Sequence, residues 1–407
     1  MINARISKIR CSVLLVLIFL FASAGTGLCV AEEAGGQDLV PDDAGTGPAK
    51  YTIDLYYKTG NSGFTVSCRD KDRGSFEKEP GFGNSDIIRG FIPIGSDQKE
   101  HVGFAWDIDG RKLYLDLNGN WDLTDDSAGV FTSETSGRFQ HFRNINLSMQ
   151  KGTLNLPYVI NMDMYCFGQS NHSCSASIVS SFAGQMTLHG IKWNITVMDN
   201  MNARIGSGDY FFMTRKDVDM GGNNNWGRLK VPKSIFLDSH NYDVSFEFQP
   251  GKTGPKLQFA LAESEKPMGR LDIEGENIAR VVLESDSSTI LLHHPEKSVS
   301  IPAGDYRCRN IFLYDKKAGI FAHDSNCAPG LTSLSVPRDQ SVTFKAGGPL
   351  ENNVKVKREG NTLNLSYRLL DAGLREYRRL QDNRDKPPAF TVYRGNKKIV
   401  SDTFEYG

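Results

Sequence analysis

The sequence lacks the short motifs by which common catalytic sites are recognised. It contains no Gly-x-Ser-x-Gly nucleophile elbow, no His-Glu-x-x-His zinc helix, no phosphate-binding glycine loop and no Cys-x-x-Cys pair. These absences exclude the serine hydrolases, zinc peptidases, P-loop enzymes and dithiol oxidoreductases that such motifs define. Local sequence therefore assigns no reaction and nominates no catalytic residue.

The sequence also lacks an excess of charge of either sign. Lys and Arg total 47, Asp and Glu total 48, and the formal net charge is −1. Such a chain has no overall field that gathers polyanions or anionic lipid. Neither nucleic acid nor an acidic membrane surface is predicted as a partner.

No long apolar run follows the N-terminus, so no transmembrane segment is expected after it. The first residues carry three basic side chains, then the apolar run Val13–Phe21, which is too short to cross a bilayer, and then small residues. This order is typical of a secretory signal peptide. We predict a signal peptide over residues 1–31, cut after Ala31 or after Ala24, and export to the periplasm or the extracellular space.

Cys29 offers a rival interpretation, in which this cysteine is lipidated. Bulky Leu28 stands where a small residue normally lies beside a lipidated cysteine, and this favours simple cleavage. The next segment, residues 32–50, is rich in Gly, Ala, Asp and Pro and has no apolar period. It is predicted to be a flexible linker before the folded part.

Helical periodicity is scarce, and alternation of apolar with polar residues dominates the rest of the chain. Tight hairpin turns are expected at Asp109-Gly110 and at His189-Gly190. The alternating stretch 244–248 should pair with 257–261 across a connection rich in Pro and Gly. We therefore predict an all-β protein built from antiparallel β-sandwich domains.

A charged, Pro-containing stretch near 263–267 separates two sets of alternating strands and predicts a linker between compact units. We place an N-terminal β domain at 51–265 and a C-terminal β-sandwich domain at 266–407. In the second domain, eight short strands separated by turn signals indicate two packed antiparallel sheets. Apolar residues at three-residue steps predict one short helix over 372–380.

The segment Ile301–Tyr306, with the sequence Ile-Pro-Ala-Gly-Asp-Tyr, is similar to the corner of prealbumin-like and carboxypeptidase-regulatory-like sandwiches. In that corner the proline and glycine turn the chain, and the tyrosine begins an inward-facing strand. The resemblance implies an Ig-like or prealbumin-like sandwich for the C-terminal domain.

Five cysteines remain after removal of the signal peptide, in a compartment expected to be oxidising. Cys166 and Cys174 flank a short polar connection and predict a disulfide across a hairpin. Cys308 with Cys327 is the next pair, which would leave Cys68 alone. Sequence does not fix the connectivity, and five buried free thiols are the alternative.

The densest run of side-chain oxygens is the loop Asp116–Asp126, directly after an alternating segment. Calcium takes about six to eight oxygen ligands, and carboxylates and amides on alternate residues of a curled loop supply them. The predicted Ca²⁺ ligands are Asp116, Asn118, Asn120, Asp122, Asp125 and Asp126. Four carboxylates in one loop repel one another unless a cation compensates. The alternative is an Asx-rich connection whose side chains cap their own turns.

Aligned from Asp116, the loop resembles a calcium hand at its first, third, fifth and seventh positions. It departs from the hand because Trp121 takes the glycine position, Ser127 takes the bidentate position and a strand precedes it. It is therefore more similar to the EF-hand-like or dockerin-type loops of exported bacterial β proteins. A second loop, Asp199–Asp209, has fewer oxygens in a different spacing, so a duplication would be imperfect and self-capping is favoured there.

The oxygen-rich loops and the sandwich pattern together resemble uncharacterised exported bacterial β-sandwich proteins, a group that implies no established activity. We expect a non-enzymatic binding or structural protein whose N-terminal β region is ordered by calcium. A glycan or a cell-surface component is the expected partner. The competing expectation is a polysaccharide-active hydrolase or lyase, with a cleft among the loops of residues 51–265.

Overall fold

A computed structural model gives the fold of the chain. It describes residues 2–6, 37–38, 48–60, 65–70, 76–94, 100–135, 137–151, 154–168, 171–202, 205–206, 208–215, 228–250, 254–315, 319–324, 333–360, 362–379 and 388–404. The predicted signal peptide lies outside these ranges except for residues 2–6, and most of the predicted linker lies outside them as well.

The all-β prediction is confirmed. The described residues form antiparallel sheets with a few parallel pairs, and their helical content is a single 3₁₀ turn, η1 (Ser127–Gly129). They include no helix with the length and hydropathy needed to cross a bilayer. Alternation of apolar residues therefore identified the class of the fold correctly.

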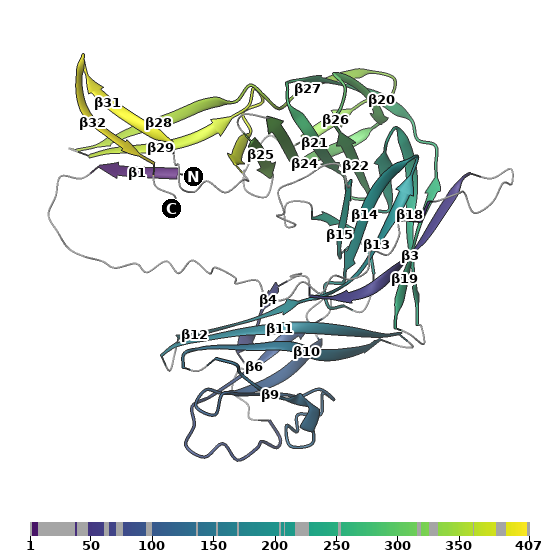
Figure 1. Ribbon diagram of the computed structural model, residues 1–407, viewed down its shortest axis with the longest axis vertical. Helices are drawn as coiled ribbons and strands as arrows, with labels where there is room; N and C mark the ends of the chain where they lie inside the picture. The colour runs from purple at the N-terminus through teal and green to yellow at the C-terminus, as the bar shows by residue number, and fades with distance from the viewer. Residues whose placement is uncertain are drawn as a thin grey trace.

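Two sheets form layers at one end of the molecule (Figure 1). The five-stranded sheet contains β5 (Arg69–Asp70), β6 (Ile87–Ile94), β7 (Glu100–Asp107), β8 (Lys112–Leu115) and β9 (Val130–Thr132). The four-stranded sheet contains β4 (Thr65–Ser67), β10 (Phe139–Lys151), β11 (Leu154–Gly168) and β12 (Asn171–Ile178). Phe104 and Trp106 from one sheet share a buried cluster with Ile160 and Met162 from the other. Burial of these apolar faces is what holds the two layers together.

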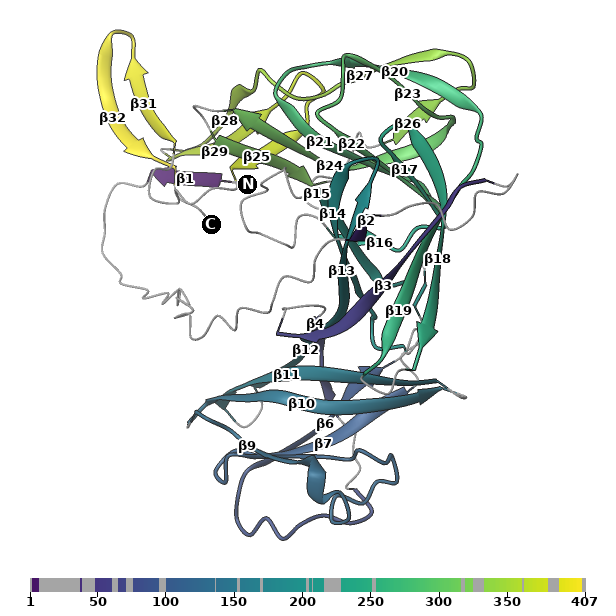
Figure 2. The same ribbon diagram turned by 45° about the vertical axis from the view of Figure 1, so that its right-hand side comes forward.

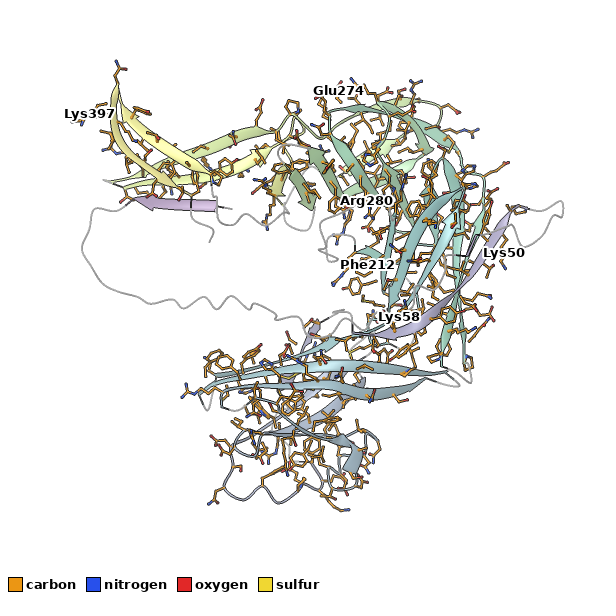
Figure 3. All side chains as sticks on the ribbon, in the orientation of Figure 1. Lys50, Lys58, Phe212, Glu274, Arg280 and Lys397 are labelled. Atoms are coloured by element: carbon orange, nitrogen blue, oxygen red, sulfur yellow. A yellow bond between two sulfur atoms is a disulfide. The ribbon has the colours of Figure 1, made fainter. Side chains whose placement is uncertain are left out.

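The middle of the molecule belongs to the largest sheet. Its strands here are β2 (Gln37–Asp38), β3 (Lys50–Thr59), β13 (Ser180–Leu188), β14 (Ile191–Met198), β15 (Tyr210–Arg215), β16 (Leu229–Lys230), β17 (Ser234–Leu237), β18 (His240–Gln249) and β19 (Lys256–Glu263). Figure 3 labels Lys50 and Lys58, near the two ends of β3. Strands β18 and β19 pair as expected, with Phe246 opposite Phe259.

The largest sheet continues into the C-terminal part of the chain. Its strands there are β21 (Ile278–Glu284), β22 (Ser288–His293), β24 (Gly304–Asp315), β25 (Gly319–Asp324) and β26 (Ser333–Val336). The same stretch of chain also contains β20 (Met268–Glu274), β23 (Ser298–Pro302) and β27 (Ser341–Lys345). Strand β17 pairs in parallel with β22, across the stretch 263–267. Strand β20, between β23 and β27, belongs to a separate three-stranded sheet. The Tyr306 hydroxyl donates to the Pro302 carbonyl over 2.9 Å and closes the corner that the sequence indicated.

The C-terminal strands extend away from the rest of the molecule (Figure 2). They are β28 (Glu351–Glu359), β29 (Thr362–Leu370), β31 (Ala389–Arg394) and β32 (Lys397–Thr403). The short strand β30 (Glu376–Arg379) instead pairs with β25. Strand β1 (Ile2–Ile6) pairs with β29, and every residue of β28 is exposed. Phe404 and Leu365 form a small buried cluster at the base of the β31–β32 hairpin.

The predicted disulfide between Cys166 and Cys174 is wrong. Cys174 bonds to Cys68, because β12 lies beside β4 with Ser175 opposite Ser67. Cys308 is a buried thiol whose pKa burial raises to about 12, and its expected partner Cys327 lies outside the described residues. Pairing of strands that are distant in sequence decided the connectivity.

Two local predictions also need correction. Residues 372–379 form a turn and strand β30 rather than a helix, because β30 pairs with β25 and β29. The hairpin at Asp109-Gly110 exists, but Asp107 pairs with Lys112, so its connection has four residues. The His189-Gly190 hairpin has the expected two-residue turn, with φ of 50° and 76°.

Candidate functional site

The loop Asp116–Asp126 leaves β8 at the edge of the N-terminal layers. Asp116 is 3% exposed, and its carboxylate accepts backbone N–H groups from Gly119 at 2.8 Å, Asn120 at 3.2 Å and Trp121 at 3.1 Å. Gly119 and Trp121 have φ of 75° and 63°, in the left-handed region. The left-handed Trp121 is notable because a calcium hand carries glycine at this position. Asp116 therefore folds the loop tightly around its own carboxylate.

Asn118, Asn120 and Asp125 meet on the exposed side of the loop. The Asn118 amide donates to Asp125 Oδ1 over 3.3 Å, and the Asn120 amide donates to Asp125 Oδ2 over 2.8 Å. The oxygens of Asn118 and Asn120 accept backbone N–H groups two residues ahead. The structure thus brings together three of the six predicted ligands.

Asp122 is held by a cation from the chain itself, which sequence reasoning missed. Lys78 Nζ lies 2.7 Å from Asp122 Oδ2, and Thr124 donates to Oδ1 through its backbone N–H and its hydroxyl. The hydrogen bonds from Lys78 and Thr124 lower the pKa of Asp122 to about 2. Leu123 N–H also donates to the Lys78 carbonyl over 3.0 Å, so the loop is tied to the segment before β6.

Asp126 accepts the Leu117 N–H over 2.9 Å. Its pKa is raised by burial, and the negative charges of Asp116 and Asp125 raise it further. Asp116 and Asp125 are therefore each close enough to repel Asp126, whereas Lys78 forms an ion pair with Asp122. Calcium ligation by the six residues remains a prediction.

The aromatic ring of Trp121 anchors the loop to the adjacent sheet. Its ring lies 5.5 Å from the Phe76 ring and 5.1 Å from the His101 ring, measured between centroids. Aromatic contacts of this kind restrict how far the loop can open. The loop is therefore a fixed feature of the N-terminal layers.

The second loop, Asp199–Asp209, is more deeply buried than the first, and its residues 203, 204 and 207 are outside the described set. Asp199 accepts the Tyr158 hydroxyl over 2.7 Å, and Asp209 accepts N–H groups of Asn200 at 2.9 Å and Gly206 at 2.7 Å. Burial, followed by the charge of Asp199, raises the pKa of Asp209 to about 7. Both carboxylates cap backbone groups, as the self-capping interpretation expects.

A group that the sequence analysis missed consists of His189, His240 and Glu263. Among the described residues it is the one set of three His, Cys, Asp or Glu side chains whose ligand atoms all lie within 4.8 Å of one another. Only the hairpin at His189-Gly190 was visible in the sequence. To find the group from the sequence, one would have had to know how β18, which follows the β17–β18 turn, pairs with the end of β19.

Two cavities lie in the C-terminal part of the chain. One, of about 500 Å³, is lined by residues that include Glu276, His294, Glu296 and Tyr314. The other, of about 620 Å³, lies among β20, β23 and the connection before β27. No protein family model matches the chain, and no curated protein or solved structure is detectably similar to it.

Proposed function

We propose that this is an exported, non-enzymatic binding or structural protein whose N-terminal β region is ordered by Ca²⁺ in the loop Asp116–Asp126. The observation that carries the proposal is an imbalance of charge. Burial raises the pKa of Asp126, and the charges of Asp116 and Asp125 raise it further, while the ion pair that Lys78 forms in the loop is with Asp122. A divalent cation would remove that repulsion.

The donor set of the loop suits a hard cation. Carboxylate and amide oxygens are the ligands that Ca²⁺ prefers, and this loop offers no nitrogen or sulfur donor of the kind that zinc selects. In our proposal Asp116, Asp125 and Asp126 supply the charge, and Asn118 and Asn120 turn their amide oxygens inward. Asp122 keeps its ion pair with Lys78 and is the weakest candidate of the six predicted ligands.

Export is supported by two independent features of the chain. The N-terminal segment has the order of a signal peptide, and the bond between Cys68 and Cys174 is of the type that persists in oxidising compartments. A periplasmic or extracellular location would also expose the loop to free calcium. We propose a glycan or a cell-surface component as the partner of the protein.

Thermal unfolding with calcium or with EGTA tests the calcium proposal. Free Ca²⁺ at a hundred times its dissociation constant should stabilise the protein by about 2.7 kcal/mol through mass action. Asp116→Ala should abolish that gain, and Asp305→Ala, an exposed residue of β24, should retain it. If calcium leaves the melting curve of each of the three proteins unchanged, the proposal is ruled out.

A second candidate function, action on a polysaccharide, is favoured by the 500 Å³ cavity. Glu276 and Glu296 line it together with half-exposed Tyr314, and such groups can contact sugar hydroxyls and ring faces. This cavity lies in the C-terminal part of the chain, so we place the cleft there rather than among the N-terminal loops. Release of reducing ends or unsaturated products from a glycan panel, lost in Glu276→Gln and Glu296→Gln, would support this candidate.

A further inference from the structure

Three residues distant in sequence come together beside the Lys50 end of β3. His189 lies in the two-residue turn between β13 and β14, and His240 begins β18 directly after the turn Asp238-Ser239. Glu263 ends β19, and its N–H donates to the Ala49 carbonyl over 2.9 Å. Figure 3 labels Lys50, which marks this end of the strand. Three separate backbone elements therefore converge on one point.

The ligand atoms are close enough for one ion. One atom from each of the three side chains lies within 4.8 Å of the other two. The two imidazole rings stack with centroids 4.6 Å apart and an angle of 19° between their planes. Zinc bonds of about 2.0–2.1 Å in a tetrahedron place donors about 3.4 Å apart. Because both histidines are exposed, side-chain rotation can supply that contraction.

The hydrogen bonds around the two histidines leave nitrogen lone pairs for a metal. His240 Nδ1 lies 2.9 Å from the Asp238 carbonyl. A carbonyl only accepts, so Nδ1 carries the proton and Nε2 keeps its lone pair. His189 Nε2 lies 2.7 Å from the Tyr242 hydroxyl, which can accept from it and leave Nδ1 as the ligand. Metal-binding histidines characteristically have such outer partners.

Glu263 is also held from outside the group. The Tyr51 hydroxyl donates to Glu263 Oε1 over 3.5 Å, and Tyr242 lies directly opposite Glu263 in the β18–β19 pair. Tyr51 and Tyr242 are both buried, so they form a fixed floor beneath the exposed histidines. Each of the three candidate ligands thus has a partner that orients it.

We propose that His189, His240 and Glu263 bind a divalent transition-metal ion, with Zn²⁺ as the first candidate. Two imidazoles and one carboxylate favour zinc and related ions over Ca²⁺, so this site is independent of the loop Asp116–Asp126. Three protein ligands leave a fourth position open for water or for a donor atom of a bound molecule. The ion would also join the β13–β14 turn to the β17–β18 turn.

Zinc titration of the chelator-treated full chain tests the proposal, with affinity measured by competition against a chromophoric chelator. The wild-type protein should bind one equivalent at this site. His189→Asn, His240→Ala and Glu263→Gln should each weaken binding by roughly tenfold or more, and Tyr242→Phe should weaken it by roughly tenfold. Asparagine is chosen at His189 because its φ of 50° is left-handed, which asparagine tolerates.

His294→Asn is the matched control, since His294 is also exposed and has a φ of 44°. This control and Asp116→Ala should bind zinc like the wild type. Modification by diethyl pyrocarbonate supplies a readout that needs no variant: zinc should protect His189 and His240 but not His294, as seen by peptide mass spectrometry. Unchanged affinity in the three ligand variants, or equal modification of His189 and His240 with and without zinc, would overturn the proposal.

Discussion

The indole Nε1 of Trp106 donates a 2.8 Å hydrogen bond to Oε1 of Gln140, and both side chains are buried. Trp106 lies on β7 and Gln140 on β10, so the bond joins the two N-terminal layers. The Gln140 amide in turn donates to the Ile108 carbonyl over 2.7 Å. This polar bridge crosses an otherwise apolar interface between the sheets.

Replacement of Gln140 by Leu should destabilise the protein by about 1–3 kcal/mol, because it leaves the Trp106 N–H buried without an acceptor. Urea denaturation measures the loss. Gln185→Leu is the control, since Gln185 bonds to Asn194 on an exposed strand face and should change stability by less than about 0.5 kcal/mol. Equal effects of the two substitutions would contradict the proposed role of the bridge.

Loss of the disulfide should be costly because it closes a long loop. Cys68 and Cys174 are 106 residues apart, and chain entropy alone predicts a loss of about 4–5 kcal/mol in a Cys68→Ser, Cys174→Ser double variant. Thermal unfolding measures the change, with Cys166→Ser as the control. Non-reduced peptide mapping should recover Cys68 linked to Cys174, and a peptide linking Cys166 to Cys174 would disprove this connectivity.

The raised pKa of Asp209 makes stability depend on pH. The Asp209 carboxyl of the folded protein stays protonated up to about pH 7, whereas in the unfolded chain it ionises near pH 3.9. The stabilisation that comes from this protonated carboxyl is therefore complete below pH 3.9 and is lost as the pH rises through 7. The full effect is roughly 4 kcal/mol. Asn cannot ionise, so the unfolding free energy of the wild type should fall relative to that of Asp209→Asn between pH 4 and pH 8. A constant difference would contradict the shift.

Asp126→Asn should act in opposite directions with and without calcium. In EGTA it removes repulsion from Asp116 and Asp125 and should raise stability slightly, by less than about 1 kcal/mol because Asp126 is partly exposed. In excess calcium it removes a ligand and should lower stability relative to the wild type. Chemical denaturation in both buffers measures the two signs, and the same sign in both would count against calcium binding by Asp126.

The local alternation of apolar residues predicted much of the fold. The rest depends on the pairing of strands that are distant in sequence. Alternation predicted the β18–β19 pair, with Phe246 opposite Phe259, because both strands bury one face and are joined by a short connection. The parallel pairing of β17 with β22 could not be predicted, since nothing local specifies a partner fifty residues away. The bond between Cys68 and Cys174 depends on such a long-range pair, between β4 and β12.

Among the candidate sites too, contacts within one loop were predictable from the sequence and contacts between distant segments were not. The side chains of Asp116–Asp126 interact within one loop, so their crowding was visible in the sequence. Lys78 was not, because a parallel bridge to Asp122 brings it there from a segment more than forty residues earlier. His189, His240 and Glu263 meet through three strands of the largest sheet, and only the assembled sheet reveals them.

Isothermal titration of the mature protein with calcium, after treatment with EGTA, tests the central claim most directly. We predict one saturable site with a dissociation constant on the order of 10⁻⁴–10⁻³ M, the range of extracellular calcium modules, and its loss in Asp116→Ala. Absence of saturable heat up to about ten times that range, or binding that Asp116→Ala leaves intact, would contradict it.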